Sequence, residues 1–124
     1  MIGYVTLGTN DLKRAASFYD QLLAGLGAKR LMDYDTFKVW GTSFDEASLA
    51  ITEPHDKKPA TVGNGVMVAI DVLKPEKVHA MYEKAIALGG TDEGPPGPRG
   101  DGWYCGYFRD LDGNKLNFFC MVPA

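Results

Sequence analysis

The stretch YVTLGTNDL, residues 4–12, has a counterpart in MVAIDVLKP, residues 67–75, and these two stretches decide the fold. In the first, Val5 and Leu7 alternate with more polar residues, which predicts a strand with two different faces. A segment with an apolar stripe at helical spacing follows it. In the second, an apolar run leads to Pro75, a residue favoured at the first position of a helix. Each stretch therefore predicts a strand followed by a helix.

The two halves of the chain align with each other from end to end. Tyr19 and Tyr82 are 63 positions apart, and Leu49 matches Leu116 near the far ends. Short strand segments complete each half, and such an internal repeat fixes the architecture. The glycine- and proline-rich run at residues 94–102 is expected to form a loop, which leaves room for only a shorter or more irregular second strand. The sequence predicts an α+β fold of two tandem βαβββ units.

The length and composition indicate how these units are organised. A chain of 124 residues fits one compact domain, residues 1–124, with the composition of an ordinary globular protein. Unit one is expected over residues 1–57 and unit two over residues 62–124. A polar linker over about residues 54–65 is expected to join them, because proline, glycine and charged residues are concentrated there.

Charge and hydropathy argue against several classes of partner. The formal net charge is −3 and no basic block occurs, which argues against nucleic acid. No apolar run approaches the roughly 20 residues that a membrane span needs, and residues 1–8 predict a strand rather than a signal peptide. The default expectation is a cytoplasmic protein in which Cys105 and Cys120 are free thiols on strands.

Two motifs carry a resemblance to a known family. The run VTLGTNDL at residues 5–12, followed by Ala15-Ala16 and Phe18-Tyr19, looks like the first strand and helix of that family. The run RDLDGNKL at residues 109–116 looks like its near-terminal hairpin. Over its whole length the chain resembles the vicinal oxygen chelate superfamily, which includes glyoxalase I, bleomycin-resistance proteins and extradiol dioxygenases. The resemblance implies curled mixed sheets around a cup-shaped cavity.

The resemblance also implies where a metal would be held. Enzymes of the superfamily bind a divalent ion through His in the first strand and Glu in the last strand of each unit. The corresponding residues here are Tyr4, Ala50, Met67 and Asn117. Alanine has no donor atom, a thioether is a poor ligand for a hard ion, and neutral tyrosine and asparagine are weak ligands. We interpret this as loss of the metal site and expect no cofactor, with a divalent metal at a non-standard site as the alternative.

The residues expected to contact a ligand belong to three groups. Some lie on the same side of the strands as the metal positions, others lie on the middle strands, and one lies in the glycine-rich loop. They are Tyr4, Thr6, Phe37, Trp40, Ala50, Met67, Arg99, Trp103, Tyr104, Tyr107, Arg109 and Asn117. Aromatic side chains with a few polar groups are typical of ligand sites. Arg99 could close over an anionic group. Arg109 could instead pair locally with Asp110 or Asp112, and the two tryptophans could be core or interface anchors.

Three functions are compatible with these observations. The first is a metal-free protein that binds a small organic molecule in the cup, as in the bleomycin-resistance branch that the chain resembles. The second is a divalent-metal-dependent lyase or dioxygenase of the glyoxalase type with an altered site. The third is a structural or interaction module whose cup is filled by its own side chains. The resemblance also leads us to expect a homodimer, and it leaves open whether the protein is an enzyme.

Overall fold

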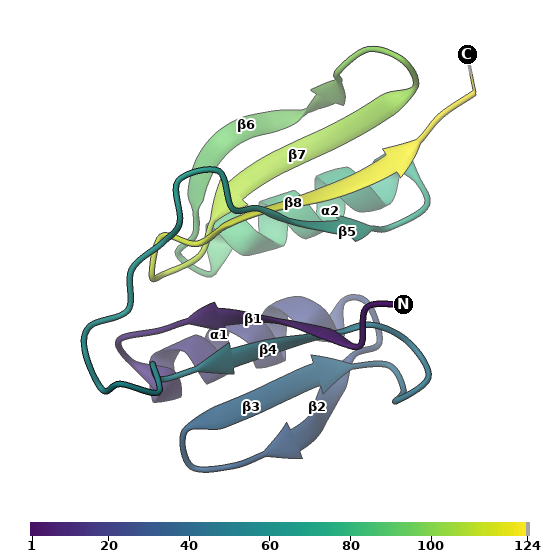
Figure 1. Cartoon of the computed structure of the whole chain (residues 1–124). Coiled ribbons are helices and arrows are strands. Elements are labelled where there is room, and N and C mark those ends of the chain that lie inside the picture. Colours follow the sequence, from purple (N-terminus) through teal and green to yellow (C-terminus); the bar gives the residue numbers. More distant parts are fainter. Residues whose placement is uncertain (124) are drawn as a thin grey trace. The chain divides into compact units, whose positions relative to one another are not determined.

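The computed structural model describes residues 1–123 and consists of two compact units, Met1–Val62 and Gly63–Ala124. Each unit contains one helix and one four-stranded sheet (Figure 1). The predicted α+β fold of two tandem βαβββ units, with curled, open sheets, is confirmed. Neither helix in the described part of the chain is long and apolar enough to cross a bilayer.

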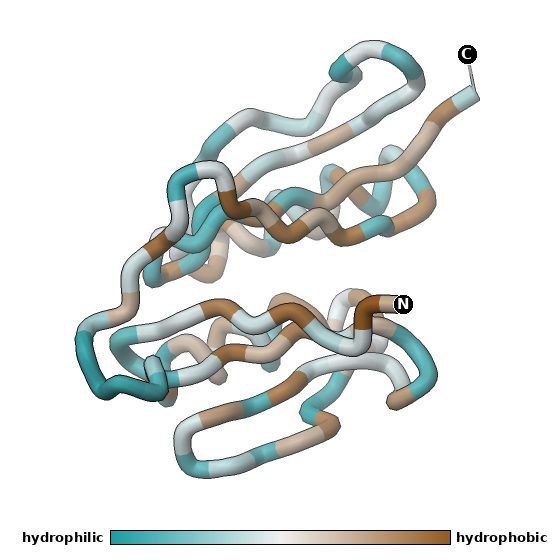
Figure 2. The backbone as a smooth tube through the Cα atoms, viewed as in Figure 1, coloured by the Kyte–Doolittle hydropathy of each residue, from teal (hydrophilic) through white to brown (hydrophobic). Residues whose placement is uncertain are grey.

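Unit one has its first and last strands side by side. Its elements in chain order are β1 (Tyr4–Gly8), α1 (Leu12–Ala24), β2 (Lys29–Asp33), β3 (Phe37–Gly41) and β4 (Ser48–Thr52). The sheet order is β1-β4-β3-β2, with β1 parallel to β4 and the other neighbours antiparallel. The parallel pair requires a crossover connection, which α1 begins. Figure 2 shows a hydrophilic segment directly after β4, where the sequence predicts the polar linker.

Unit two repeats this topology. Its elements are β5 (Val68–Asp71), α2 (Pro75–Ala87), β6 (Thr91–Pro98), β7 (Trp103–Arg109) and β8 (Lys115–Met121). The sheet order is β5-β8-β7-β6, again with a parallel pair between the first and last strands of the unit. The expected free thiols, Cys105 and Cys120, are both buried in this sheet.

Strand β6 differs from the sequence prediction. Residues 94–102 were expected to be a loop, but β6 extends to Pro98 and has eight residues where β2 has five. Its pairing with β7 shifts register between Asp92 and Gly94 and again between Gly94 and Gly97. Because β6 is the edge strand of its sheet, prolines without an N–H can be accommodated, and glycines allow the bulges. The expectation of a shorter or more irregular strand is therefore confirmed through the irregularity, and the expectation of a loop is wrong for the residues up to Pro98.

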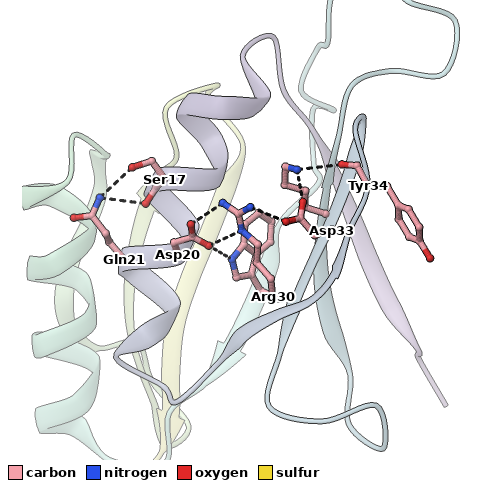
Figure 3. A network of polar contacts seen from close by, with 8 residues as sticks. Ser17, Asp20, Gln21, Arg30, Asp33 and Tyr34 are labelled. Atoms are coloured by element: carbon pink, nitrogen blue, oxygen red, sulfur yellow. Dashed lines mark hydrogen bonds and ion pairs between the residues drawn. The ribbon is translucent and has the colours of Figure 1, made fainter.

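A polar network ties α1 to the sheet of unit one (Figure 3). The Arg30 guanidinium donates through Nε and Nη2 to the two carboxylate oxygens of Asp20, at 2.9 and 2.7 Å. The Trp40 indole Nε1 donates to Asp20 Oδ1 at 2.8 Å. Arg30 also pairs with Asp33 at 3.1 Å, and Lys38 pairs with the same carboxylate. One helical carboxylate thus connects α1 to both β2 and β3.

This network predicts a specific acid sensitivity. The hydrogen bonds from Arg30 lower the pKa of Asp20, although partial burial acts in the opposite direction. Asp20 therefore stabilises the fold above its unfolded pKa of about 3.9, and this stabilisation is lost as the pH falls through the lower folded pKa. We expect the wild-type free energy of unfolding to fall more steeply below about pH 4 than that of Asp20→Asn. Urea unfolding from pH 7 to pH 2.5 measures both slopes, and parallel curves would contradict the prediction.

Candidate functional site

In unit one, the helix covers one side of the sheet, and we call the opposite side the open face. Trp40 points toward α1, as its bond to Asp20 shows. Side chains alternate along a strand, so Phe37 points to the open face. The residue pairing β3–β4–β1 then places Ala50 and Thr6 on the open face as well, with Tyr4 two residues before Thr6. Four predicted site residues, Tyr4, Thr6, Phe37 and Ala50, therefore share one surface.

Aromatic rings occupy part of this surface. Tyr4 and Phe37 form an edge-to-face pair with ring centroids 5.8 Å apart. Ala50 on the same face is fully buried, whereas Thr6 is exposed. The open face of unit one is thus partly filled by the side chains of the unit itself.

Two predicted site residues lie on the helix-covered sides instead. Trp40 is 1% exposed, with its ring 5.8 Å from that of Tyr19 in α1. The Tyr104 hydroxyl lies 2.7 Å from Nε2 of His79 in α2. The physical reason is that successive side chains of a strand point to opposite faces of the sheet. Each of these two residues is adjacent in sequence to one that points to the open face, so it points to the helix. Trp40 and Tyr104 therefore differ from their predicted placement.

The open face of unit two gathers more of the predicted residues. A Cβ on Gly106 would lie 3.4 Å from the Tyr82 side chain of α2, so Gly106 faces the helix. Its neighbours Cys105 and Tyr107 consequently point to the open face. Strand pairing places Asn117 directly beside Tyr107. This face has the polar and aromatic groups that the sequence predicts for a ligand site.

Asn117 has an unusual environment on this face. It is 3% exposed, and its Oδ1 has no hydrogen-bond partner within residues 1–123. A buried acceptor without a partner costs about 1–3 kcal/mol. Most buried polar atoms in native proteins are satisfied, so this oxygen calls for an explanation.

Two aromatic rings lie near one end of the same face. Trp103 and Phe119 have ring centroids 5.3 Å apart. Trp103 is 45% exposed, and Phe119, two residues after Asn117 on β8, is half-buried. Together they present an apolar surface next to the unsatisfied amide oxygen of Asn117.

Tyr107 is flanked by two cations. The Arg99 guanidinium carbon lies 5.5 Å and the Lys115 Nζ 5.4 Å from the centre of its ring. The neighbouring Cys105 thiol and burial raise the pKa of Tyr107, whereas the Arg99 charge and the Asn117 amide act in the opposite direction. The phenol therefore stays protonated at neutral pH.

Arg99 is held in place by the backbone of β6. Its Nη2 donates to the Pro95 carbonyl at 2.5 Å and its Nη1 to the Pro98 carbonyl at 3.3 Å. A Cβ on Gly97 would lie 3.2 Å from Nη1, and one on Gly94 would lie 3.4 Å from Nη2. The absence of side chains at these two glycines thus gives the guanidinium room to lie along the strand.

Arg109 has a different partner from the one predicted. Its Nε pairs with Glu93 Oε1 at 3.1 Å, and its Nη1 donates to the Gly113 carbonyl at 3.1 Å. Asp110 instead accepts from Asn114 N and Asn114 Nδ2 at 2.9 and 3.0 Å, closing the β7–β8 turn. Arg109 thus joins neighbouring strands rather than pairing with the acids of its own turn.

The four positions that the family resemblance assigns to a metal have a poor donor set. They offer a phenol at Tyr4, a thioether at exposed Met67, an amide at Asn117 and no donor at Ala50. Hard divalent ions prefer carboxylate and imidazole ligands. Among residues 1–123, no group of three or more His, Cys, Asp and Glu side chains is placed to hold a metal ion. These residues do not fit the family metal.

A separate hollow of about 920 Å³ lies within unit one, beside the segment that follows β4. Glu53, His55, Lys57 and Lys58 contribute to its lining. None of the twelve predicted site residues except Phe37 lines it. The hollow is therefore distinct from the surface around Asn117.

Sequence reasoning missed three residues of the open face of unit two. Lys115 and Phe119 lie two positions before and two after Asn117 on the same strand. The two-residue period of a strand was the signal that could have found both, because it puts all three side chains on one face. Glu93 was missed because the bulges of β6 obscure its register.

Comparison with known proteins gives a consistent result. Residues 1–118 match the model of the Glyoxalase/Bleomycin resistance protein/Dioxygenase superfamily. A glyoxalase/bleomycin resistance protein from Albidiferax ferrireducens T118 is similar over 97% of this chain and 98% of its own, with 36% identity and a TM-score of 0.88. No curated protein matches the chain.

More distant structures share the fold. A glyoxalase/bleomycin resistance protein/dioxygenase family enzyme from Burkholderia phytofirmans PsJN has 19% identity and a TM-score of 0.78, with 97% of this chain and 98% of that chain covered. The fosfomycin resistance protein FosX from Listeria monocytogenes has 20% identity and a TM-score of 0.72, with 98% and 93% covered.

Proposed function

Since this chain belongs to the glyoxalase/bleomycin resistance protein/dioxygenase superfamily, we propose that it binds a small organic molecule on the open face of unit two without a metal. The observation that carries the proposal is the buried Asn117 Oδ1 without a partner. An N–H or O–H group of a ligand would satisfy this oxygen and remove its desolvation cost. The proposed site is therefore centred on Asn117.

The surroundings of Asn117 support a flat ligand. Trp103 and Phe119 offer aromatic surface on the same face, and aromatic side chains dominate ligand contacts because they bury large apolar area at low entropic cost. The poor donor set at the family metal positions supports binding without an ion.

A fragment screen by ¹H–¹⁵N NMR tests the proposal. The library consists of neutral, flat heteroaromatic compounds that carry an N–H or O–H donor. The two tryptophans provide an internal control, because Trp103 lies on the open face and Trp40 is buried against α1. We expect binders to shift the Trp103 indole signal and the Asn117 side-chain amide signals while the Trp40 signal stays in place.

Two results would contradict this proposal. One is a screen in which no fragment moves the Trp103 or Asn117 signals. The other is binding of zinc, nickel, manganese or iron at one ion per chain that is lost when Tyr4 or Asn117 is changed. That second result would favour a metal-dependent enzyme.

Replacing Asn117 with leucine is expected to separate binding from stability. Leucine has a similar shape and no unsatisfied acceptor, so we expect the free energy of unfolding to rise by about 1 kcal/mol. Fragment affinity is expected to fall by about tenfold, because the ligand donor loses its acceptor. Urea unfolding and NMR titration measure the two effects. Unchanged affinity in Asn117→Leu would place the ligand elsewhere.

A further inference from the structure

The charges around Tyr107 suggest which class of ligand the proposed site takes. Neither Arg99 nor Lys115 forms an ion pair with an acidic side chain among residues 1–123. Arg109, on the same face, is paired with Glu93. Arg99, from the β6 side, and Lys115, on β8, thus approach the Tyr107 ring from the strands on either side of β7. Neither has a counter-charge within the described residues, which favours an anion on this face.

Arg99 is pre-organised for this task. Two of the five N–H groups of a guanidinium are used by the carbonyls of Pro95 and Pro98, which leaves three for another acceptor. The side chain is also fixed over Tyr107 and fitted against Gly94 and Gly97. A cation that is held in place before binding loses less side-chain entropy when a ligand arrives.

The net charge of the face indicates the charge of the ligand. Its cations are Arg99, Arg109 and Lys115, and its carboxylates are Glu93 and Asp71, which lies beside Phe119. Three positive and two negative groups leave one positive charge. This balance matches a monoanion such as a carboxylate better than a dianionic phosphate.

We propose that the ligand is a small organic carboxylate, whose charged group binds between Arg99 and Lys115 over Tyr107 while an N–H or O–H on its flat body donates to Asn117. This inference rests on the proposed function. A planar carboxylate also suits the fork of donors on a guanidinium.

Matched pairs of acids and primary amides test this inference. We choose indole-2-carboxylate with indole-2-carboxamide, and 3-hydroxybenzoate with 3-hydroxybenzamide, because both members of each pair keep the same flat body and donor. NMR titration of the full-length chain gives the affinities. Each acid is expected to bind about tenfold tighter than its amide at low ionic strength, the size expected for charge-assisted hydrogen bonds. Added salt should reduce this preference.

Four variants locate the preference in the structure. Lys115→Gln and Arg99→Gln are each expected to reduce it to about threefold or less, with little change in amide affinity. Gly97→Ala keeps every charge but displaces the guanidinium, since its Cβ would lie 3.2 Å from Arg99 Nη1; it should also reduce the preference. Lys77→Gln on α2 removes a charge from the helix side of the unit and should leave the preference unchanged. Arg99→Gln also removes the hydrogen bonds from Arg99 to the backbone of β6. Lys115→Gln therefore tests the effect of the charge without changing β6.

The outcomes separate the two proposals. Equal affinity of acid and amide, with the Trp103 signal shifted by both, would overturn the carboxylate inference and leave the proposed function standing. A preference that persists in both Lys115→Gln and Arg99→Gln would also overturn the inference. If neither member of a pair moves the Trp103 signal, the inference fails, and the fragment screen decides the proposed function independently.

Discussion

Replacing Trp40 with alanine is expected to lower the free energy of unfolding by about 4 kcal/mol, the typical cost of removing a buried tryptophan. The indole is almost completely buried against Tyr19, and its Nε1 donates to Asp20. The variant therefore leaves a large cavity between α1 and β3 and removes one of the bonds that hold the helical carboxylate. Urea unfolding followed by far-UV circular dichroism measures the loss. An effect of this size is a large fraction of the total stability of a small protein.

Two further variants make the Trp40 prediction specific. Trp40→Phe keeps most of the apolar volume but loses the indole N–H, so we expect a loss of about 1–2 kcal/mol. Trp103→Ala removes the same side chain from an exposed position and is expected to cost less than about 1 kcal/mol. Fragment binding should persist in Trp40→Phe. Equal losses in Trp40→Ala and Trp103→Ala would contradict the assignment of Trp40 to the core.

Replacing Gly90 with alanine is expected to cost about 3 kcal/mol, at the upper end of the usual effect of overpacking. A Cβ at this buried position would lie 2.8 Å from the Ala85 carbonyl oxygen and 2.9 Å from the Arg109 carbonyl oxygen. Both obstacles are backbone atoms, at the end of α2 and at the end of β7, so no side-chain rotation relieves the clash. The Gly90 N–H also donates to the Ala85 carbonyl at 2.9 Å, which fixes the glycine in this position.

Gly3→Ala is the matched control for this prediction, because nothing lies within 4 Å of its expected Cβ. Its effect should stay within about 0.5 kcal/mol. The Trp103 indole signal, followed by NMR in urea, reports on unit two, where Gly90 lies. A Gly90→Ala midpoint equal to that of Gly3→Ala would show that the turn after α2 can relax.

The architecture was accessible from the sequence because it depends on periodicity and repetition. The alternation around Val5 and the match between Tyr19 and Tyr82 gave the order of the elements. Strand β6 was not accessible in the same way. Proline and glycine usually indicate a loop, and only the edge position of β6 allows a bulged strand with that composition.

The site was only partly predictable, for a geometrical reason. A strand pattern separates two faces but does not say which face the helix covers when both contain large residues. Trp40 and Val39 illustrate this, since both are buried, on opposite sides. The unsatisfied oxygen of Asn117 and the partner of Arg109 depend on distances across strands, which no sequence pattern contains. Self-association and a cytoplasmic location stay predictions.

The parallel pairing of first and last strands has a consequence for synthesis on the ribosome. Tyr4 pairs with Ser48 and Val68 pairs with Leu116. In each sheet, the first strand is therefore joined to the last by contacts between residues more than 40 positions apart. A nascent chain that ends before β4 leaves β1 without its neighbour, exposed as an unpaired edge. Once Thr52 has been synthesised, every strand of the first sheet has been made, before any strand of the second. The duplication thus divides a slow, non-local folding problem into two successive halves.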